Sequence, residues 1–116
     1  MQLLEKNILP DGFEYPIEFL AVIEHKLISW EPWQIENGNS LLLRYDGLKE
    51  RYPKYQLIPF ANRGDNDDIA CWDIAIPGKV IIIHDFASQG WERRKIYDSF
   101  WDWFRQAIQD MVEWDR

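Results

Sequence analysis

Residues 55–85, YQLIPFANRGDNDDIACWDIAIPGKVIIIHD, decide the fold of this chain. The segment contains three runs rich in apolar and β-branched residues: 55–61, 69–74 and 79–85. Such runs between turn signals such as Pro77-Gly78 predict strands, and short connections predict antiparallel neighbours. The segment therefore predicts an antiparallel meander, in which Pro59 indicates an edge strand or a bulge.

Apolar residues at helical spacing lie on both sides of this meander. The first set consists of Phe19, Leu20, Ile23 and Leu27. It predicts an amphipathic helix near 15–27. The second set consists of Phe100, Phe104, Ala107, Ile108 and Met111, widened by Trp103. It predicts a helix capped by Asp98 or Ser99 and reaching about Glu113. If Phe104 is fully buried there, Phe104→Ala should cost about 3–5 kcal/mol.

The remaining segments carry weaker patterns. We expect a short strand near 33–36, a turn at Asn37-Gly38 and a short helix around 45–51. The basic run Arg93-Arg94-Lys95 is interpreted as a solvated segment before the last helix. Because the helices are not interleaved with the strands, the order predicts an α+β fold. We expect one domain, 1–116, with a mostly antiparallel, bent sheet flanked by N-terminal and C-terminal helices.

Composition narrows the class of partner. The chain has 20 acidic and 13 basic residues, a formal net charge of −7, which disfavours nucleic acid and anionic membrane surfaces. Seven Trp, six Phe and five Tyr exceed what a core of this size needs, so some should reach the surface and contact a partner. The single Cys71 and the absence of a signal-like apolar run lead us to expect a cytoplasmic protein.

No motif for metal binding, cofactor binding or catalysis is recognisable. The acidic stretch 65–68 fails the EF-hand pattern, because its sixth position is Ala70 and its twelfth is Ile76. Cys71, His84 and His25 lack paired zinc-ligand spacing. We therefore expect no metal and no cofactor.

Nucleophilic chemistry is the next alternative. Cys71 and His84 lie on the second and third predicted strands and could become neighbours, but a buried structural cysteine is favoured. His84-Asp85 is interpreted as a local hydrogen-bonding pair. A hydrolase using two of the 20 acidic residues stays a remote alternative without a motif.

Several short motifs resemble the SUKH superfamily. They are Leu57-Ile58-Pro59-Phe60-Ala61, Gly64-Asp65, Ile69-Ala70-Cys71-Trp72-Asp73-Ile74, Gly78-Lys79-Val80 and Ser99-Phe100. Leu9-Pro10 before the first helix is similar to the family's opening, so the resemblance covers about residues 9–108. The chain departs from the family in two ways: the interval between the first predicted helix and the motif Leu57-Ile58-Pro59-Phe60-Ala61 is short, and Arg63-Gly64 stands where a run of glycines is common. The resemblance implies an α+β fold with a bent sheet.

The resemblance also implies a function: a bacterial immunity protein that neutralises a toxin, often one acting on nucleic acid. The alternative is a scaffold related to cell-wall synthesis regulators. A basic toxin suits an acidic protein, so we predict a protein-binding surface and no enzymatic activity. Its candidate residues are Asp65, Asp67, Asp68, Trp91 and Glu92. We expect a monomer or weak homodimer.

Overall fold

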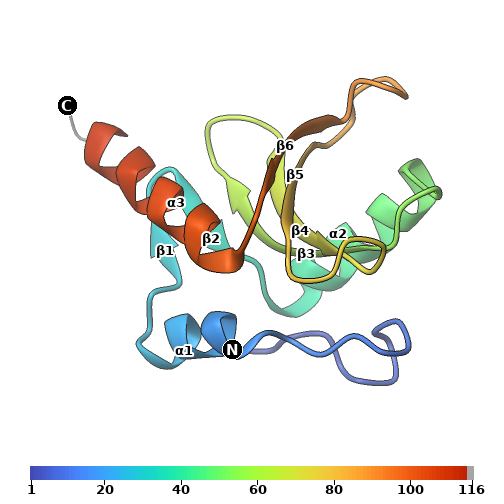
Figure 1. Ribbon diagram of the computed structural model, residues 1–116, viewed down its shortest axis with the longest axis horizontal. Helices are drawn as coiled ribbons and strands as arrows, with labels where there is room; N and C mark the ends of the chain where they lie inside the picture. The colour runs from blue at the N-terminus through green and yellow to red at the C-terminus, as the bar shows by residue number, and fades with distance from the viewer. Residues whose placement is uncertain (115–116) are drawn as a thin grey trace.

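The computed structural model describes residues 1–114, which form three helices and one six-stranded sheet (Figure 1). The helices are α1 (Ile17–Glu24), α2 (Gly38–Arg51) and α3 (Phe100–Trp114). The strands are β1 (Ser29–Trp30), β2 (Trp33–Ile35), β3 (Leu57–Arg63), β4 (Asp68–Asp73), β5 (Val80–His84) and β6 (Arg93–Tyr97). All neighbouring strands are antiparallel and follow chain order from β1 to β6. The predicted α+β class and the central meander are confirmed.

The central strands are apolar on both faces because both faces are covered. On one face, Phe60 and Trp72 stack at 4.2 Å between ring centroids, and Trp103 of α3 meets Phe60 edge-on at 4.9 Å. Phe19 of α1 packs on the same face, 5.0 Å from Trp72. The other face carries Leu57, Ile69, Cys71, Ile81 and Ile83, buried beneath Leu48 and Tyr52 of α2. Figure 1 shows α3 and α2 on opposite sides of the sheet.

Helix α3 confirms the predicted C-terminal element, but its buried centre differs. The Ser99 hydroxyl accepts the Asp102 N–H at 3.1 Å, as an N-cap does. Trp103 is 1% exposed, whereas Phe104 is only partly buried. The indole of Trp30 donates to the Ala107 carbonyl at 3.2 Å, which ties α3 to β1.

Three elements differ from the sequence prediction. Helix α1 is shorter than 15–27, and its buried residues are Phe19 and Val22, while Leu20 and Leu27 are exposed. Helix α2 begins at Gly38 rather than near residue 45, because Leu41, Tyr45 and Leu48 extend one buried stripe. The short strand β1 was not predicted.

Two predictions about strands have different outcomes. The run Arg93-Arg94-Lys95 is part of β6, because β5 offers an open edge for hydrogen bonding. Pro59 lies in β3 opposite Cys71 of β4, whereas the ladder with β2 covers only Ala61 to Arg63, so at Pro59 the strand is open on the β2 side, as an edge is. The register shift between Pro59 and Ala61 confirms the predicted bulge.

No helix within the described range 1–114 combines the length and apolar character needed to cross a membrane.

Candidate protein-interaction surface

The β3–β4 turn and the β5–β6 loop lie at the same end of the sheet. Asp68, the first residue of β4, is the register partner of His84, the last residue of β5. The Asp85 N–H donates to the Asp67 carbonyl at 2.9 Å, which joins the two connections directly. Figure 1 shows both loops at the top of the view. The fold therefore brings together the two segments that carry the predicted binding residues.

Two of the three predicted aspartates in the acidic turn already have a side-chain partner. Arg63 donates to both carboxylate oxygens of Asp65, at 2.9 and 3.0 Å, and this hydrogen bonding lowers the pKa of Asp65. Asp68 pairs with His84 Nδ1 at 2.8 Å. Asp67 is exposed and forms no ion pair with any residue of the described range 1–114. Of the three predicted aspartates, Asp67 therefore presents the most available negative charge.

The two predicted residues of the β5–β6 loop take opposite positions. Trp91 is 73% exposed, so its indole is available to a partner. Glu92 is buried: its carboxylate accepts the Tyr55 hydroxyl and the Gly90 N–H, both at 2.7 Å. The Tyr55 hydrogen bond lowers the pKa of Glu92, and burial raises the pKa of Tyr55 to about 12. Glu92 thus holds the loop in place beneath Trp91 and does not face outward with it.

Phe86 is an exposed aromatic residue that the sequence analysis missed. It is 66% exposed and has a φ of 64°, in the left-handed region that a bulky residue rarely adopts. Its N–H donates to Asp85 Oδ1 at 2.9 Å, and the Arg51 guanidinium lies 4.1 Å from its ring centroid. The only signal in the sequence was an aromatic residue between a predicted strand and the polar stretch 87–90. Backbone and cation–π contacts therefore hold an apolar ring in solvent.

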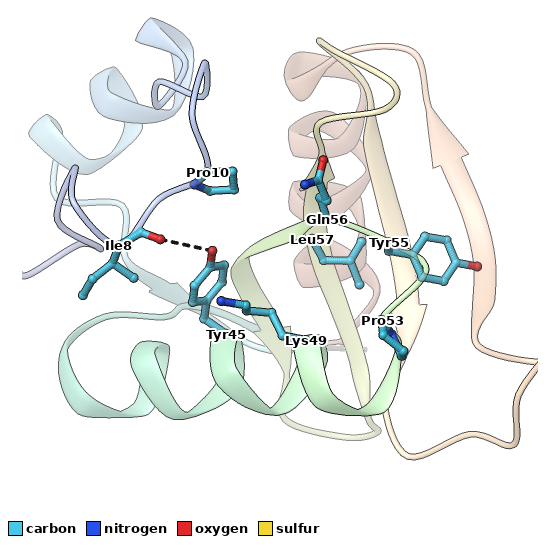
Figure 2. Close-up of a pocket in the computed structure, with 8 residues that line it drawn as sticks. All are labelled: Ile8, Pro10, Tyr45, Lys49, Pro53, Tyr55, Gln56 and Leu57. Atoms are coloured by element: carbon cyan, nitrogen blue, oxygen red, sulfur yellow. Dashed lines mark hydrogen bonds between the residues drawn. The ribbon is translucent and has the colours of Figure 1, made fainter.

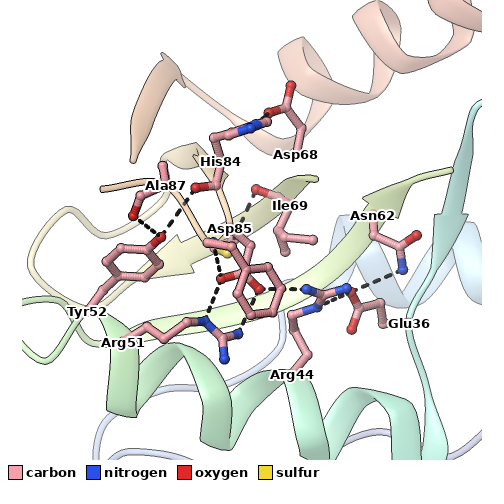
Figure 3. Close-up of polar contacts among 12 residues, drawn as sticks. Glu36, Arg44, Arg51, Tyr52, Asn62, Asp68, Ile69, His84, Asp85 and Ala87 are labelled. Atoms are coloured by element: carbon pink, nitrogen blue, oxygen red, sulfur yellow. Dashed lines mark hydrogen bonds and ion pairs between the residues drawn. The ribbon is translucent and has the colours of Figure 1, made fainter. Parts of the chain in front are cut away.

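A buried charge network supports this loop from below (Figure 3). Asp85 is 1% exposed and accepts hydrogen bonds from Arg44 at 2.6 Å and from Arg51 Nε and Nη2, both at 2.7 Å. Burial alone would raise the pKa of Asp85, but the hydrogen bonds from Arg51 and Arg44 outweigh it and lower the pKa. Since both arginines belong to α2, the network joins α2 to the first residue of the loop.

Glu36 completes the network at the end of β2. Its Oε1 atom accepts Arg44 Nε at 3.2 Å and the Asn62 amide at 3.1 Å. Burial outweighs these contacts and raises the pKa of Glu36. Glu36 and Asp85 are therefore two buried carboxylates that share the Arg44 guanidinium, an arrangement that links α2 to the ends of β2 and β5.

Cys71 and His84 do not meet. Cys71 is the register partner of Ile81 and is fully buried, and burial raises its thiol pKa well above the ordinary value. The expected structural cysteine is confirmed. His84 pairs across the sheet with Asp68, not with Asp85 as predicted, because Asp85 turns toward the arginines of α2. Within residues 1–114, no three His, Cys, Asp or Glu side chains gather as metal ligands would.

A pocket of about 380 Å³ lies between the N-terminal segment, α2 and the start of β3 (Figure 2). It is lined by Ile8, Pro10, Tyr45, Lys49, Pro53, Tyr55, Gln56 and Leu57. None of these lining residues is a carboxylate, and the Tyr45 hydroxyl already donates to the Ile8 carbonyl at 3.3 Å. The pocket thus lacks the paired acids that a carboxylate-based hydrolase needs.

No family model, curated protein or solved structure matches this chain. The surface is therefore assessed by its own geometry. It consists of Phe86 and Trp91 on a braced loop and Asp67 on the adjoining turn. We call these three residues the aromatic–acidic surface.

Proposed function

We propose that this chain is a non-enzymatic protein-binding module that contacts a basic partner through the aromatic–acidic surface. The observation that carries the proposal is the pair of aromatic side chains, Phe86 and Trp91, that one loop holds 66% and 73% exposed. Tryptophan and other large aromatics dominate the binding energy of protein interfaces when they enter a partner's pocket. Exposure of two such rings on one short loop supports binding.

The cost of the loop conformation supports the same interpretation. A bulky residue with positive φ costs about 1–2 kcal/mol relative to ordinary backbone. At Phe86 this cost is opposed by the Asp85 hydrogen bond and the Arg51 contact, although the ring itself gains little burial. Because the strained backbone places an apolar ring in solvent, where it adds little to the stability of the fold, binding of a partner explains the strain better.

Charge and resemblance indicate the class of partner. A net charge of −7, with exposed Asp67 on the turn that is hydrogen-bonded to the start of this loop, would steer a basic protein toward this surface, at up to about 10⁸–10⁹ M⁻¹s⁻¹ at low salt. The resemblance to the SUKH superfamily adds a biological role. We propose a bacterial immunity protein that acts in the cytoplasm and neutralises a toxin with a basic, nucleic-acid-acting cleft.

The test uses the product of a neighbouring reading frame with a toxin-like domain, titrated by calorimetry at low and high NaCl. Trp91→Ala should weaken binding by at least about 30-fold, equivalent to about 2 kcal/mol. Phe86→Gly should also weaken it, while relief of the positive φ keeps the free energy of unfolding within about 1 kcal/mol of wild type. Asp67→Lys should flatten the salt dependence, whereas Glu24→Lys, the same charge change on α1, should affect it less.

Two results would contradict the proposal. If both aromatic variants bind within twofold of wild type, the aromatic–acidic surface is not the interface. If the purified chain turns over a small substrate and Glu36→Gln abolishes that turnover, the protein is an enzyme.

A further inference from the structure

Strand β6 leaves one side of the sheet open. It pairs with β5 on its inner side, and no strand within the described range 1–114 pairs with its outer side. The five residues Arg93–Tyr97 therefore offer a row of outward N–H and C=O groups, which can receive another extended chain. The opposite edge strand, β1, is only two residues long.

The open edge is basic although the protein is acidic. Arg93, Arg94 and Lys95 are consecutive and exposed. None of them forms an ion pair or a side-chain hydrogen bond with any residue that the structure describes; the Lys95 ammonium lies 4.7 Å from the Tyr97 ring centroid. The nearby carboxylate of Glu92 is buried and already engaged by Tyr55. The three charges are thus left for a ligand outside the chain.

The cations flank the edge on both faces of the sheet. Lys95 lies opposite Ile82, on the face covered by α3, whereas Arg93 lies opposite Ile83, on the face covered by α2. Ile96, 37% exposed, adds an apolar contact on the α2 face. An extended segment added to β6 would have its side chains alternate between these two faces.

Charge separates the possible occupants of this edge. Pairing of β6 with a second copy would bring three cationic side chains from each chain together, which is unfavourable. A long nucleic acid would extend past the strand edge and be repelled by the rest of the protein, whose net charge is −7. A short acidic peptide segment meets the cations alone and uses the backbone groups as well.

We infer that β6 binds an extended acidic peptide segment by strand addition. The backbone of the segment pairs with the outer side of Arg93–Tyr97, and its carboxylates pair with Arg93, Arg94 and Lys95. This site uses none of the residues of the aromatic–acidic surface, so it stands or falls independently of the proposed function.

The test uses a fluorescein-labelled peptide of alternating Glu and Val, about eight residues long, which covers the five-residue strand with a margin at each end. Fluorescence anisotropy should show binding that weakens with added NaCl. Arg94→Glu with Lys95→Glu should weaken binding at least about tenfold. Lys6→Glu with Lys26→Glu, the same charge change at two exposed lysines elsewhere, should change it less than threefold.

A second peptide separates strand addition from simple charge attraction. It carries the same charges but has N-methyl groups on alternate residues, which removes hydrogen-bond donors without altering the protein. Loss of binding by this peptide, with amide chemical-shift changes concentrated at 93–97, supports the inference. The inference would be overturned if both peptides bind equally or if neither binds. It would also be overturned if a single-stranded oligonucleotide binds more tightly, or if the free protein forms a dimer through β6.

Discussion

Truncation of Asp85 is the most informative perturbation of this structure, because one buried carboxylate joins α2 to the β5–β6 loop. Asp85→Ala removes the acceptor of four hydrogen bonds, from Arg44, from two nitrogens of Arg51 and from the Phe86 N–H. It leaves two guanidinium groups without their shared anion. Both α2 packing and loop conformation should respond.

The expected magnitude follows from burial. Breaking a buried ion pair from one side costs about 3–5 kcal/mol. The side chains of Arg44 and Arg51 are 26% and 30% exposed, so both can regain water, and Arg44 keeps its contact with Glu36. We therefore expect a loss near the lower limit, about 3 kcal/mol. With an unfolding entropy of about 2.1 cal/mol/K per residue, 116 residues convert this loss into a Tm about 12 °C lower.

The assay is urea unfolding at pH 7, followed by tryptophan fluorescence and far-UV circular dichroism. Asp85→Asn keeps the size but not the charge of the side chain and should lose most of the same stability. Asp65→Ala breaks the Arg63 ion pair on the exposed turn and should lose less than about 1 kcal/mol. If both Asp85 variants unfold within 1 kcal/mol of wild type, the network does not hold α2 on the sheet, and our account of the loop is wrong.

Three further predictions follow from burial and charge. The pKa values of the Asp85 and Glu92 carboxyl groups are lowered in the folded state, so the stability that these groups add to the fold should be complete above about pH 5 and lost as the pH falls. The unfolding free energy, measured against pH in the acid range, should therefore change less steeply for Asp85→Asn than for wild type. An unchanged slope would argue against this linkage. Trp103→Ala should lower the free energy of unfolding by about 3–5 kcal/mol in the same urea assay, whereas Phe104→Ala should lower it by less than about 2 kcal/mol because Phe104 is only partly buried. Equal losses would contradict the assignment of Trp103 as the centre of the apolar face of α3. The Cys71 thiol should react with Ellman's reagent only after denaturation; rapid labelling of the native protein would show that the α2 face opens.

Local patterns in the sequence were sufficient for the elements whose stability is mostly local. The β-branched runs between polar turns predicted β3, β4 and β5, and the stripe that follows Ser99 predicted α3. They were not sufficient for β6, since Arg93-Arg94-Lys95 has no apolar alternation. This segment becomes a strand because β5 supplies unpaired backbone groups along its edge, which is a property of the assembled sheet.

The candidate surface divides in the same way. Its acidic residues and Trp91 could be named from composition and loop position, but Phe86 and the burial of Glu92 could not. Composition determined that the protein is acidic, rich in aromatic residues and without a recognisable catalytic motif. Tertiary structure decided which charges remain available, because the register that places His84 beside Asp68 and the packing that brings α2 arginines to Asp85 join residues far apart in the chain.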